Sequence, residues 1–168
     1  NIEGEICSQS KYIFNGYLND KKQTRNAILK KNIFRTGDAG YLDEDNYLIV
    51  SGRYKEIIIR GAINIFPYDI ERVLEELKYI EKAVVIGHED EIFGEILVAF
   101  IKTKKNNIID GRKIFKYCLD NLADYQVPNL FYKTDIFPMV ALNKISKYEI
   151  KKNYKQYARK KNLIFNSN

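Results

Sequence analysis

Asp38 is the first residue whose setting suggests chemistry. It follows Arg35, Thr36 and Gly37, and we expect it on a turn with its carboxylate free. A carboxylate on a rigid turn can accept two hydrogen bonds from a vicinal diol such as a ribose. The competing interpretation is an ordinary Gly-Asp turn without a ligand, which these four residues taken alone favour.

The segment from Gly52 to Glu56 is a second candidate, because it clusters Arg53 and Lys55 beside a glycine. Such a segment suits a hinge or a contact with an anion. The competing interpretation is that the charged residues are the solvated ends of a strand.

Lys144 is a third candidate, in the loop after Pro138, where an ammonium can reach a phosphate or carboxylate oxygen. Residues 144–168 hold eight of the 28 basic residues and one of the 22 acidic residues, which leaves 20 bases and 21 acids in the first 143. Lys144 is therefore also the first base of a solvated basic tail on a nearly neutral body. The formal charge of +6 does not describe a uniformly basic nucleic-acid binder.

The composition is that of a globular protein, with 168 residues, 45% hydrophobic and 30% charged. No apolar run approaches the roughly 20 residues that span a bilayer, and no leader peptide opens the sequence, so we expect no transmembrane segment and a cytoplasmic location. Cys7 and Cys118 lie far apart and His88 is the only histidine, so no metal site is predicted. We expect both cysteines to be buried, reduced thiols.

The elements that would position these residues follow from the hydrophobic pattern. Alternating runs in the first third predict an antiparallel hairpin region, and the run at 57–59 predicts a buried strand that ends at Gly61. Apolar residues at i, i+3, i+4 and i+7 predict a helix that begins at Pro67. Further expected elements are strands at 83–87, 96–103 and 130–137, a helix capped by Asp110, and a final helix capped by Ser146 with Glu149.

This order of elements predicts an α+β fold. Residues 55–168 form an expected small domain with a short antiparallel sheet flanked by helices, and residues 1–54 are too few to bury a core easily. They are expected to be the β-rich end of a larger domain. The chain also starts at Asn1 without a methionine, so we expect a fragment of a longer protein.

The joint order of these motifs resembles the C-terminal third of the acyl-CoA synthetases, which are AMP-forming, adenylate-forming ligases. Six stretches, up to about residue 151, support the resemblance: Gly16-Tyr17-Leu18; Arg35-Thr36-Gly37-Asp38 with Gly40-Tyr41-Leu42; Gly52-Arg53-Tyr54-Lys55-Glu56-Ile57-Ile58; Asn64-Ile65-Phe66-Pro67 with Ile70-Glu71; Leu122-Ala123-Asp124-Tyr125-Gln126-Val127-Pro128; and Asn143-Lys144-Ile145.

The resemblance implies a division of the chain and several residue roles. Residues 1–54 would be the C-terminal end of the large AMP-binding domain, and 55–168 the mobile lid domain. Asp38 resembles the aspartate that holds the ribose hydroxyls of ATP and AMP, and Arg53 the arginine that supports the same ribose. Lys55 occupies the hinge position about which the lid rotates.

Three further positions take roles from the resemblance. Lys144 resembles the catalytic lysine that the lid inserts between the substrate carboxylate and the α-phosphate. Gly61 and Ala62 resemble the strand edge that lines the pantetheine tunnel of CoA, although the family has a glycine where Ala62 stands. Asn143 likewise replaces the glycine that usually precedes the catalytic lysine.

The leading hypothesis is a fragment of an ATP-dependent acid–CoA ligase, which forms acyl-AMP from a carboxylic acid and passes the acyl group to the CoA thiol. The expected cofactors are ATP, CoA and Mg²⁺, the last bound by the part before Asn1. The phosphate loop and the acid pocket also lie outside these residues, so the fragment alone is expected to be inactive. The sequence gives no indication of the oligomeric state.

Two alternatives remain open. An adenylation domain could load a carrier protein instead of CoA, although the proline of Asn64-Ile65-Phe66-Pro67 favours the CoA ligases of the family. A non-catalytic basic module could bind nucleic acid, since Tyr148, Tyr154 and Tyr157 interleave with the bases of the tail. Against that module, Ile150, Tyr154 and Tyr157 fall at helical spacing suited to docking, and no nucleic-acid partner is expected.

Overall fold

The structure is a computed structural model that describes residues 2–30, 32–104, 109–140 and 144–167. Its contacts divide the chain into two compact units, Asn1–Lys55 and Glu56–Asn168. This division lies one residue from the boundary expected at 54/55. We call the two parts unit 1 and unit 2 and describe each by itself.

Unit 1 is an antiparallel sheet with one short helix. Its central strand, β3, pairs with each of the other three strands, and β3 and β4 form the predicted hairpin around the turn at 43–46. The elements are β1 (Gly4–Gln9), α1 (Lys21–Ala27), β2 (Ile28–Leu29), β3 (Ile33–Leu42) and β4 (Leu48–Arg53).

Unit 1 buries few side chains. Among its described residues only Ala39, Gly40 and Ser51 are fully buried, while the apolar side chains of β4 and its turn stay exposed. Cys7 in β1 is exposed as well, so the expectation that both cysteines are buried is wrong for Cys7. β1 is half-buried over its first three residues and exposed over Cys7–Gln9, and the sequence of β1 alone does not reveal where other parts of the fold cover it.

Unit 2 is built on a six-stranded sheet with helices on both faces, which confirms the predicted α+β class. Its strands are β5 (Ile58–Arg60), β6 (Ile63–Ile65), β7 (Ile80–Asp90), β8 (Gly94–Thr103), β9 (Leu130–Lys133) and β12 (Leu163–Asn166), with a separate pair β10 (Met139–Val140) and β11 (Lys144–Ile145). Its helices are α2 (Pro67–Glu75), α3 (Gly111–Asn121), α4 (Lys147–Lys152) and α5 (Tyr154–Tyr157), with short 3₁₀ turns at η2 (Asp124–Gln126) and η4 (Lys160–Asn162). A further 3₁₀ turn, η1 (Tyr54–Glu56), includes the last two residues of unit 1 and the first residue of unit 2.

The sheet of unit 2 is mixed rather than wholly antiparallel. β7 and β8 form a long antiparallel hairpin, whereas β9 runs parallel to β8. The connection between β8 and β9 contains α3, and such a helical crossover is what parallel neighbours require. Hydrophobic pattern alone does not distinguish the two directions.

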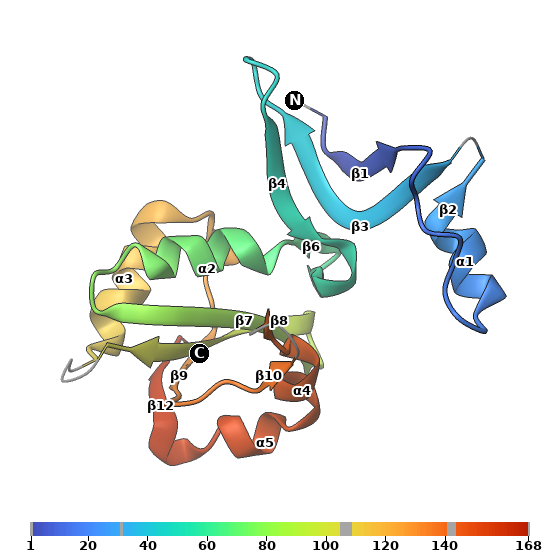
Figure 1. Ribbon diagram of the computed structural model, residues 1–168. Coiled ribbons are helices and arrows are strands. Elements are labelled where there is room, and N and C mark those ends of the chain that lie inside the picture. The colour runs from blue at the N-terminus through green and yellow to red at the C-terminus, as the bar shows by residue number, and fades with distance from the viewer. Residues whose placement is uncertain (1, 31, 105–108, 141–143, 168) are drawn as a thin grey trace. The chain divides into compact units, whose positions relative to one another are not determined.

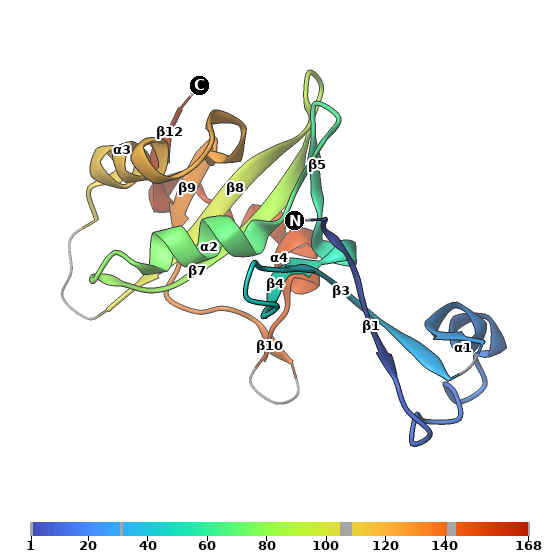
Figure 2. The same ribbon diagram turned by 90° about the horizontal axis from the view of Figure 1, so that it is seen from above.

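Alternation along β7 and β8 divides the core between the two faces of the sheet. Ala83 and Val85 face one cluster, which includes side chains of α2 and α3, and Val84 and Ile86 face the other, which includes Ile150 of α4. Figure 1 shows α2 and α3 on one side of the sheet and α4 and α5 on the other, and α2 lies over β7 in the view from above (Figure 2). Because successive side chains of a strand point to opposite faces, one continuous apolar run supplies both clusters.

The helix predicted from Pro67 and the cap predicted at Asp110 are confirmed. Pro67 is the first residue of α2, whose buried face includes Ile70 and Leu74. The Asp110 side chain accepts hydrogen bonds from the backbone N–H groups of Arg112 and Lys113 at the start of α3. No described helix is both long and apolar enough to cross a membrane.

Three expectations about unit 2 need correction. Of the run at 57–59, only Ile58 and Ile59 lie in the short strand β5; Ile58 is buried and Ile59 is 53% exposed, because successive side chains of a strand point to opposite faces. The strand expected at 130–137 ends at Lys133. The final helix is interrupted at Asn153, and the chain continues into α5 and then β12, which pairs with β9.

Candidate functional site

The structure brings Asp38 and Arg53 together inside unit 1. They are directly opposite each other in the β3–β4 pair, and the Arg53 Nε donates to Asp38 Oδ1 at 2.6 Å. The second guanidinium nitrogen, Nη2, donates to the Thr36 carbonyl at 3.3 Å. About a third of the Asp38 side chain is exposed, and a carboxylate has roughly four lone-pair sites, so Asp38 keeps acceptor capacity for a diol.

Asp38 lies in β3, so the expectation of a turn with a free carboxylate is wrong. In the pairing of β1 with β3, Glu5 lies opposite Ala39 and Cys7 lies opposite Arg35. The single β1 residue Ile6 therefore faces the three β3 residues 36–38. This bulge contains Gly37, whose φ of 75° is left-handed. Bulges of this kind redirect side chains and are common beside active sites.

Thr36 fixes the bulge, and sequence reasoning assigned it no separate role. Its hydroxyl donates to the Ile6 carbonyl at 2.7 Å and accepts from the Asp38 N–H at 3.0 Å. The Glu5 carboxylate accepts from the Gly37 N–H at 3.3 Å and from Arg35. The signal in the sequence was the run of polar residues around Gly37. An irregular backbone leaves N–H and C=O groups without strand partners, and polar side chains nearby can bond to them.

Lys55, the expected hinge residue, lies in η1 at the end of unit 1, and its side chain is exposed. Its neighbour Glu56 is the first residue of unit 2 and forms an ion pair with Lys147.

Lys144, the expected catalytic lysine, begins β11 and is exposed. It pairs with Val140 of β10, and β10 projects away from the six-stranded sheet in Figure 2. Ser146 follows the strand, where its N–H donates to the Pro138 carbonyl at 2.9 Å and its hydroxyl accepts from the Glu149 N–H. The ammonium of Lys144 is therefore presented on a short hairpin with a fixed base. Asn143 lies outside the described residues.

Gly61 and Ala62 form the two-residue turn of the β5–β6 hairpin. Their φ angles are 53° and 67°, which is the left-handed pair that a type I′ turn requires. The Gly61 N–H donates to the Phe93 carbonyl at 2.8 Å, and the guanidinium of Arg60 donates to the Tyr125 carbonyl and lies over the Phe93 ring. Ala62 thus occupies a backbone conformation that suits the glycine of the family.

Two of the three tyrosines in the basic tail, Tyr154 and Tyr157, pack against unit 2, whereas Tyr148 is 71% exposed. Tyr154 stacks on His88 with ring centroids 3.8 Å apart and meets Phe100 edge-on, and Tyr157 also packs against Phe100. Rings in such contacts are not available for stacking on nucleic-acid bases, which counts against a nucleic-acid module.

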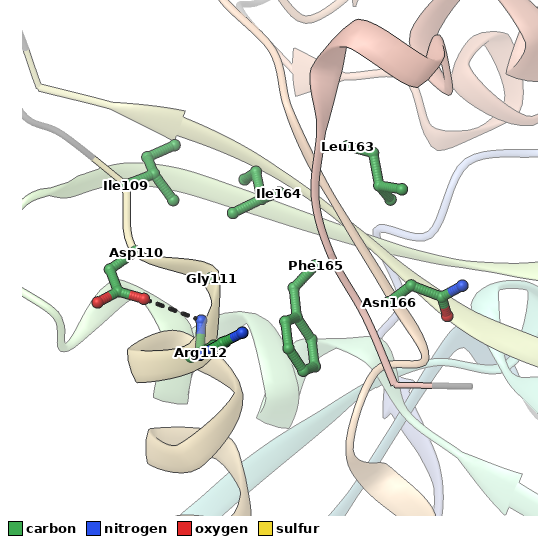
Figure 3. Close-up of a pocket in the computed structure, with 8 residues that line it drawn as sticks. All are labelled: Ile109, Asp110, Gly111, Arg112, Leu163, Ile164, Phe165 and Asn166. Carbon is green, nitrogen blue, oxygen red and sulfur yellow. Dashed lines mark hydrogen bonds between the residues drawn. The ribbon is translucent and has the colours of Figure 1, made fainter.

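A hollow beside the start of α3 is a further candidate binding place (Figure 3). It lies between that helix start and β12, with Ile109, Ile164 and Phe165 among its lining residues. The first free N–H groups of α3 bond to Asp110, as the dashed line in Figure 3 marks for Arg112. The helix start therefore already has a carboxylate and offers no new anion site. No cluster of metal-ligating side chains occurs among the described residues.

Comparisons with known proteins agree with this arrangement. Residues 69–144 match the family described as the AMP-binding enzyme C-terminal domain. A putative acyl-CoA synthetase of Bacillus subtilis is 35% identical over 89% of this chain and 27% of its own length.

Two solved structures extend the comparison. The o-succinylbenzoate CoA synthetase of Bacillus subtilis, in complex with its acyl-adenylate intermediate, superposes with a TM-score of 0.81 at 28% identity, over 92% of this chain and 30% of that one. The amide bond synthetase of Marinactinospora thermotolerans gives a TM-score of 0.83 at 28% identity, over 90% of this chain and 31% of that one. The chain thus spans less than a third of the length of the relatives that it matches.

Proposed function

Because this chain belongs to the adenylate-forming ligases, as a C-terminal part of such an enzyme, we propose that the complete protein is an ATP-dependent acid–CoA ligase. A carboxylate oxygen of the acid attacks the α-phosphorus of ATP, pyrophosphate leaves, and the thiol of CoA then displaces AMP from the acyl-adenylate. The similarity to CoA ligases over nearly the whole chain supports this reaction. A cytoplasmic location is part of the same proposal, since ATP and CoA are present there.

Asp38 and Arg53 are the residues of unit 1 that we propose to hold the ribose of ATP. The ion pair between them fixes the Asp38 carboxylate on the β3 bulge, so that its remaining acceptor sites can take the two vicinal hydroxyl groups. As part of the same proposal, the Mg²⁺ that accompanies the phosphates is held by residues of the large domain outside this chain.

Lys144 is the proposed catalytic residue of unit 2. Two anions, the substrate carboxylate and the α-phosphate, must approach each other, and a positioned ammonium lowers their repulsion while charge builds on the phosphate oxygens. Lys144 is exposed in the short β10–β11 hairpin, and this exposure supports the role, because the ammonium can reach a bound substrate while the backbone of β11 stays paired with β10. As part of the same proposal, Lys55 is the hinge about which unit 2 rotates as a lid, and Gly61 and Ala62 line the path of the CoA arm.

The test of this role uses the full-length enzyme with Lys144→Ala. Acyl-AMP formation should fall by about a hundredfold or more, the usual scale for losing one charge-stabilising group, while thioester formation from supplied acyl-AMP persists. Release of pyrophosphate and release of AMP measure the two half-reactions separately. Equal losses in both would refute the assigned role.

The isolated chain is expected to be inactive, because its described residues offer no phosphate-binding loop and no acid pocket. Pyrophosphate exchange by the purified 168-residue chain, screened with short, long and aromatic acids, should stay at background. The same screen on the full-length protein identifies the acid, and robust turnover by the short chain would contradict the expectation.

CoA is the proposed acyl acceptor, and Pro67 bears on this choice. Pro67 is typical of the CoA ligases, but it also has a structural reason, since it is the first residue of α2. A carrier-protein thiol is the alternative acceptor, and the amide bond synthetase among the neighbours is named for an amide product. Comparing CoA, a carrier protein and an amine as acceptors of the preformed acyl-AMP decides among them.

A further inference from the structure

Lys147 is a partly buried lysine that the proposed reaction leaves without a role. It is the first residue of α4, three positions after Lys144, and its side chain is only 20% exposed. Lysines are seldom withdrawn from water unless their ammonium is paired. We therefore expect the Lys147 ammonium to be paired with acidic side chains.

Two carboxylates hold the Lys147 ammonium inside unit 2. Nζ lies 2.9 Å from Glu71 Oε1 and 3.1 Å from Glu56 Oε2. Glu71 is on the buried face of α2 and also accepts from the Val85 N–H of β7 at 2.7 Å. Lys147 thus ties the start of α4 to η1, to α2 and to the central hairpin of the sheet.

The two carboxylates that hold Lys147 differ in burial. Burial raises the pKa of the Glu71 carboxyl, and the neighbouring Lys147 ammonium opposes that shift. The Glu71 side chain is 12% exposed and that of Glu56 is 31% exposed, so Glu71 is the partner that is more withdrawn from water. Removing the Lys147 charge would end the attraction that holds the start of α4 and would leave the buried Glu71 carboxylate without this ammonium partner.

The same short segment carries Lys144. β11 consists of Lys144 and Ile145, and its β10 partner is only two residues long. The anchors that follow are the Ser146 N–H bond to Pro138, the Lys147 ion pairs and the fully buried Ile150. The ion pair between Lys147 and Glu56 also links the start of α4 to the residue that follows the proposed hinge, Lys55.

We propose that Lys147 is a positioning residue, which through Glu71 and Glu56 fixes the direction of the hairpin that presents Lys144 during acyl-AMP formation. This inference rests on the proposed function of Lys144. A displacement of about 1 Å in a catalytic group can cost around a hundredfold in rate, so a loosened hairpin base is expected to slow adenylation selectively.

The experiment compares Lys147→Met with Lys147→Arg in the full-length enzyme. Methionine keeps the unbranched apolar stem of the side chain, one atom shorter, and removes the charge, whereas arginine restores the charge. Acyl-AMP formation should fall about tenfold to a hundredfold in the methionine variant and return to within about threefold of wild type in the arginine variant. Thioester formation from supplied acyl-AMP should change less than twofold. Lys152→Met, an exposed lysine at the end of the same helix, is the matched control and should behave as wild type.

A second readout does not depend on catalysis. Hydrogen–deuterium exchange of peptides covering residues 144–150 should be faster by about fivefold or more in Lys147→Met and unchanged in Lys152→Met, because amide protection follows the local stability of the segment. If the wild-type enzyme forms no acyl-AMP with any acid, the proposed function fails, while the exchange result still tests the anchoring of this segment.

Three results would overturn the inference: normal acyl-AMP formation in Lys147→Met, equal losses in both half-reactions, or unchanged exchange at 144–150. Should the methionine variant fail to fold, Glu56→Gln gives the same test, since this carboxylate is partly exposed and its loss leaves Glu71 in place. Acyl-AMP formation should then slow by about threefold or more, and a wild-type rate overturns the inference.

Discussion

Asp38 and Lys144 are held in different ways, although both are proposed to contact ATP. Asp38 is locked by an ion pair and by the hydrogen bonds of Thr36 within a sheet. Lys144 is fixed mainly through backbone pairing in a two-residue strand and through the anchors that follow it. A substitution at Asp38 should therefore affect a preformed binding group, whereas one near Lys144 should affect where the ammonium is presented.

Asp38→Ala in the full-length enzyme should raise the KM for ATP by about tenfold to a hundredfold, the scale expected for losing hydrogen bonds to a charged acceptor. The ion pair with Arg53 is partly exposed and worth about 0–1 kcal/mol, so the unfolding midpoint should move little. Steady-state kinetics against ATP concentration measure the effect.

The control for Asp38 is Asp45→Ala, in the exposed turn of the same hairpin, which should leave the ATP requirement unchanged. A normal ATP dependence of Asp38→Ala would count against the ribose contact.

At the scale of elements, the turn of the β5–β6 hairpin holds an alanine, Ala62, in a left-handed backbone conformation that favours glycine. Two-residue hairpin turns with two left-handed residues favour glycine or asparagine, and the chain has Gly61 followed by Ala62. A left-handed residue with a Cβ costs roughly 1–2 kcal/mol, which the surrounding bonds of Arg60 and Gly61 offset.

Ala62→Gly should raise the free energy of unfolding by about 0.5–1 kcal/mol, because relief of the left-handed strain exceeds the extra entropy of glycine in the unfolded chain. Gly61→Ala should lower it by a similar amount. No atom lies within 4 Å of a Cβ built on Gly61, so the cost is conformational and not a clash.

Urea denaturation of the purified chain, followed by circular dichroism, measures both variants of this turn. A gain from Gly61→Ala, or a loss from Ala62→Gly, would contradict the left-handed assignment.

The elements that the sequence predicted correctly are those stabilised by residues close together in the chain. Pro67, the spacing of Ile70 and Leu74, and the Asp110 cap fixed α2 and the start of α3, since these signals act within one turn of helix. The interruption at Asn153 and the strand β12 were missed because β12 is stabilised by a distant partner, β9. Local pattern contains no information about such pairing.

For the molecule as a whole, the two units have unequal cores. Both faces of the unit 2 sheet are covered by helices and packed with fully buried side chains, whereas unit 1 buries very few of its described residues. Each unit contains one cysteine, Cys7 in unit 1 and Cys118 on the buried face of α3. The two thiols therefore report on the two units separately.

At pH 8 Cys7 should react rapidly with a maleimide or a disulfide reagent, while Cys118 reacts only when unit 2 opens. Burial raises the pKa of the Cys118 thiol from 9.0 to about 12, which withdraws the reactive thiolate. Because the folded pKa is the higher one, this thiol favours the folded state fully below pH 9, and that contribution is lost as the pH rises toward 12.

Thiol titration with and without denaturing urea measures these reactivities, and Cys7→Ser isolates the slow thiol. Rapid labelling of Cys118 in the native chain would show that its core is open.

The sequence by itself determined the family resemblance, the α+β class and the residue types able to bind a ribose or a phosphate, because motif order and hydrophobic period are local properties. It also singled out Asp38, Arg53 and Lys144, whose roles stay proposals. Only the tertiary structure decided that Asp38 lies on a strand bulge paired with Arg53, and that Lys147 meets Glu56 and Glu71. The residues of the Lys147 group are separated by 15 to 91 positions, and only the tertiary packing of η1, α2 and α4 brings the two carboxylates and the ammonium within bonding distance.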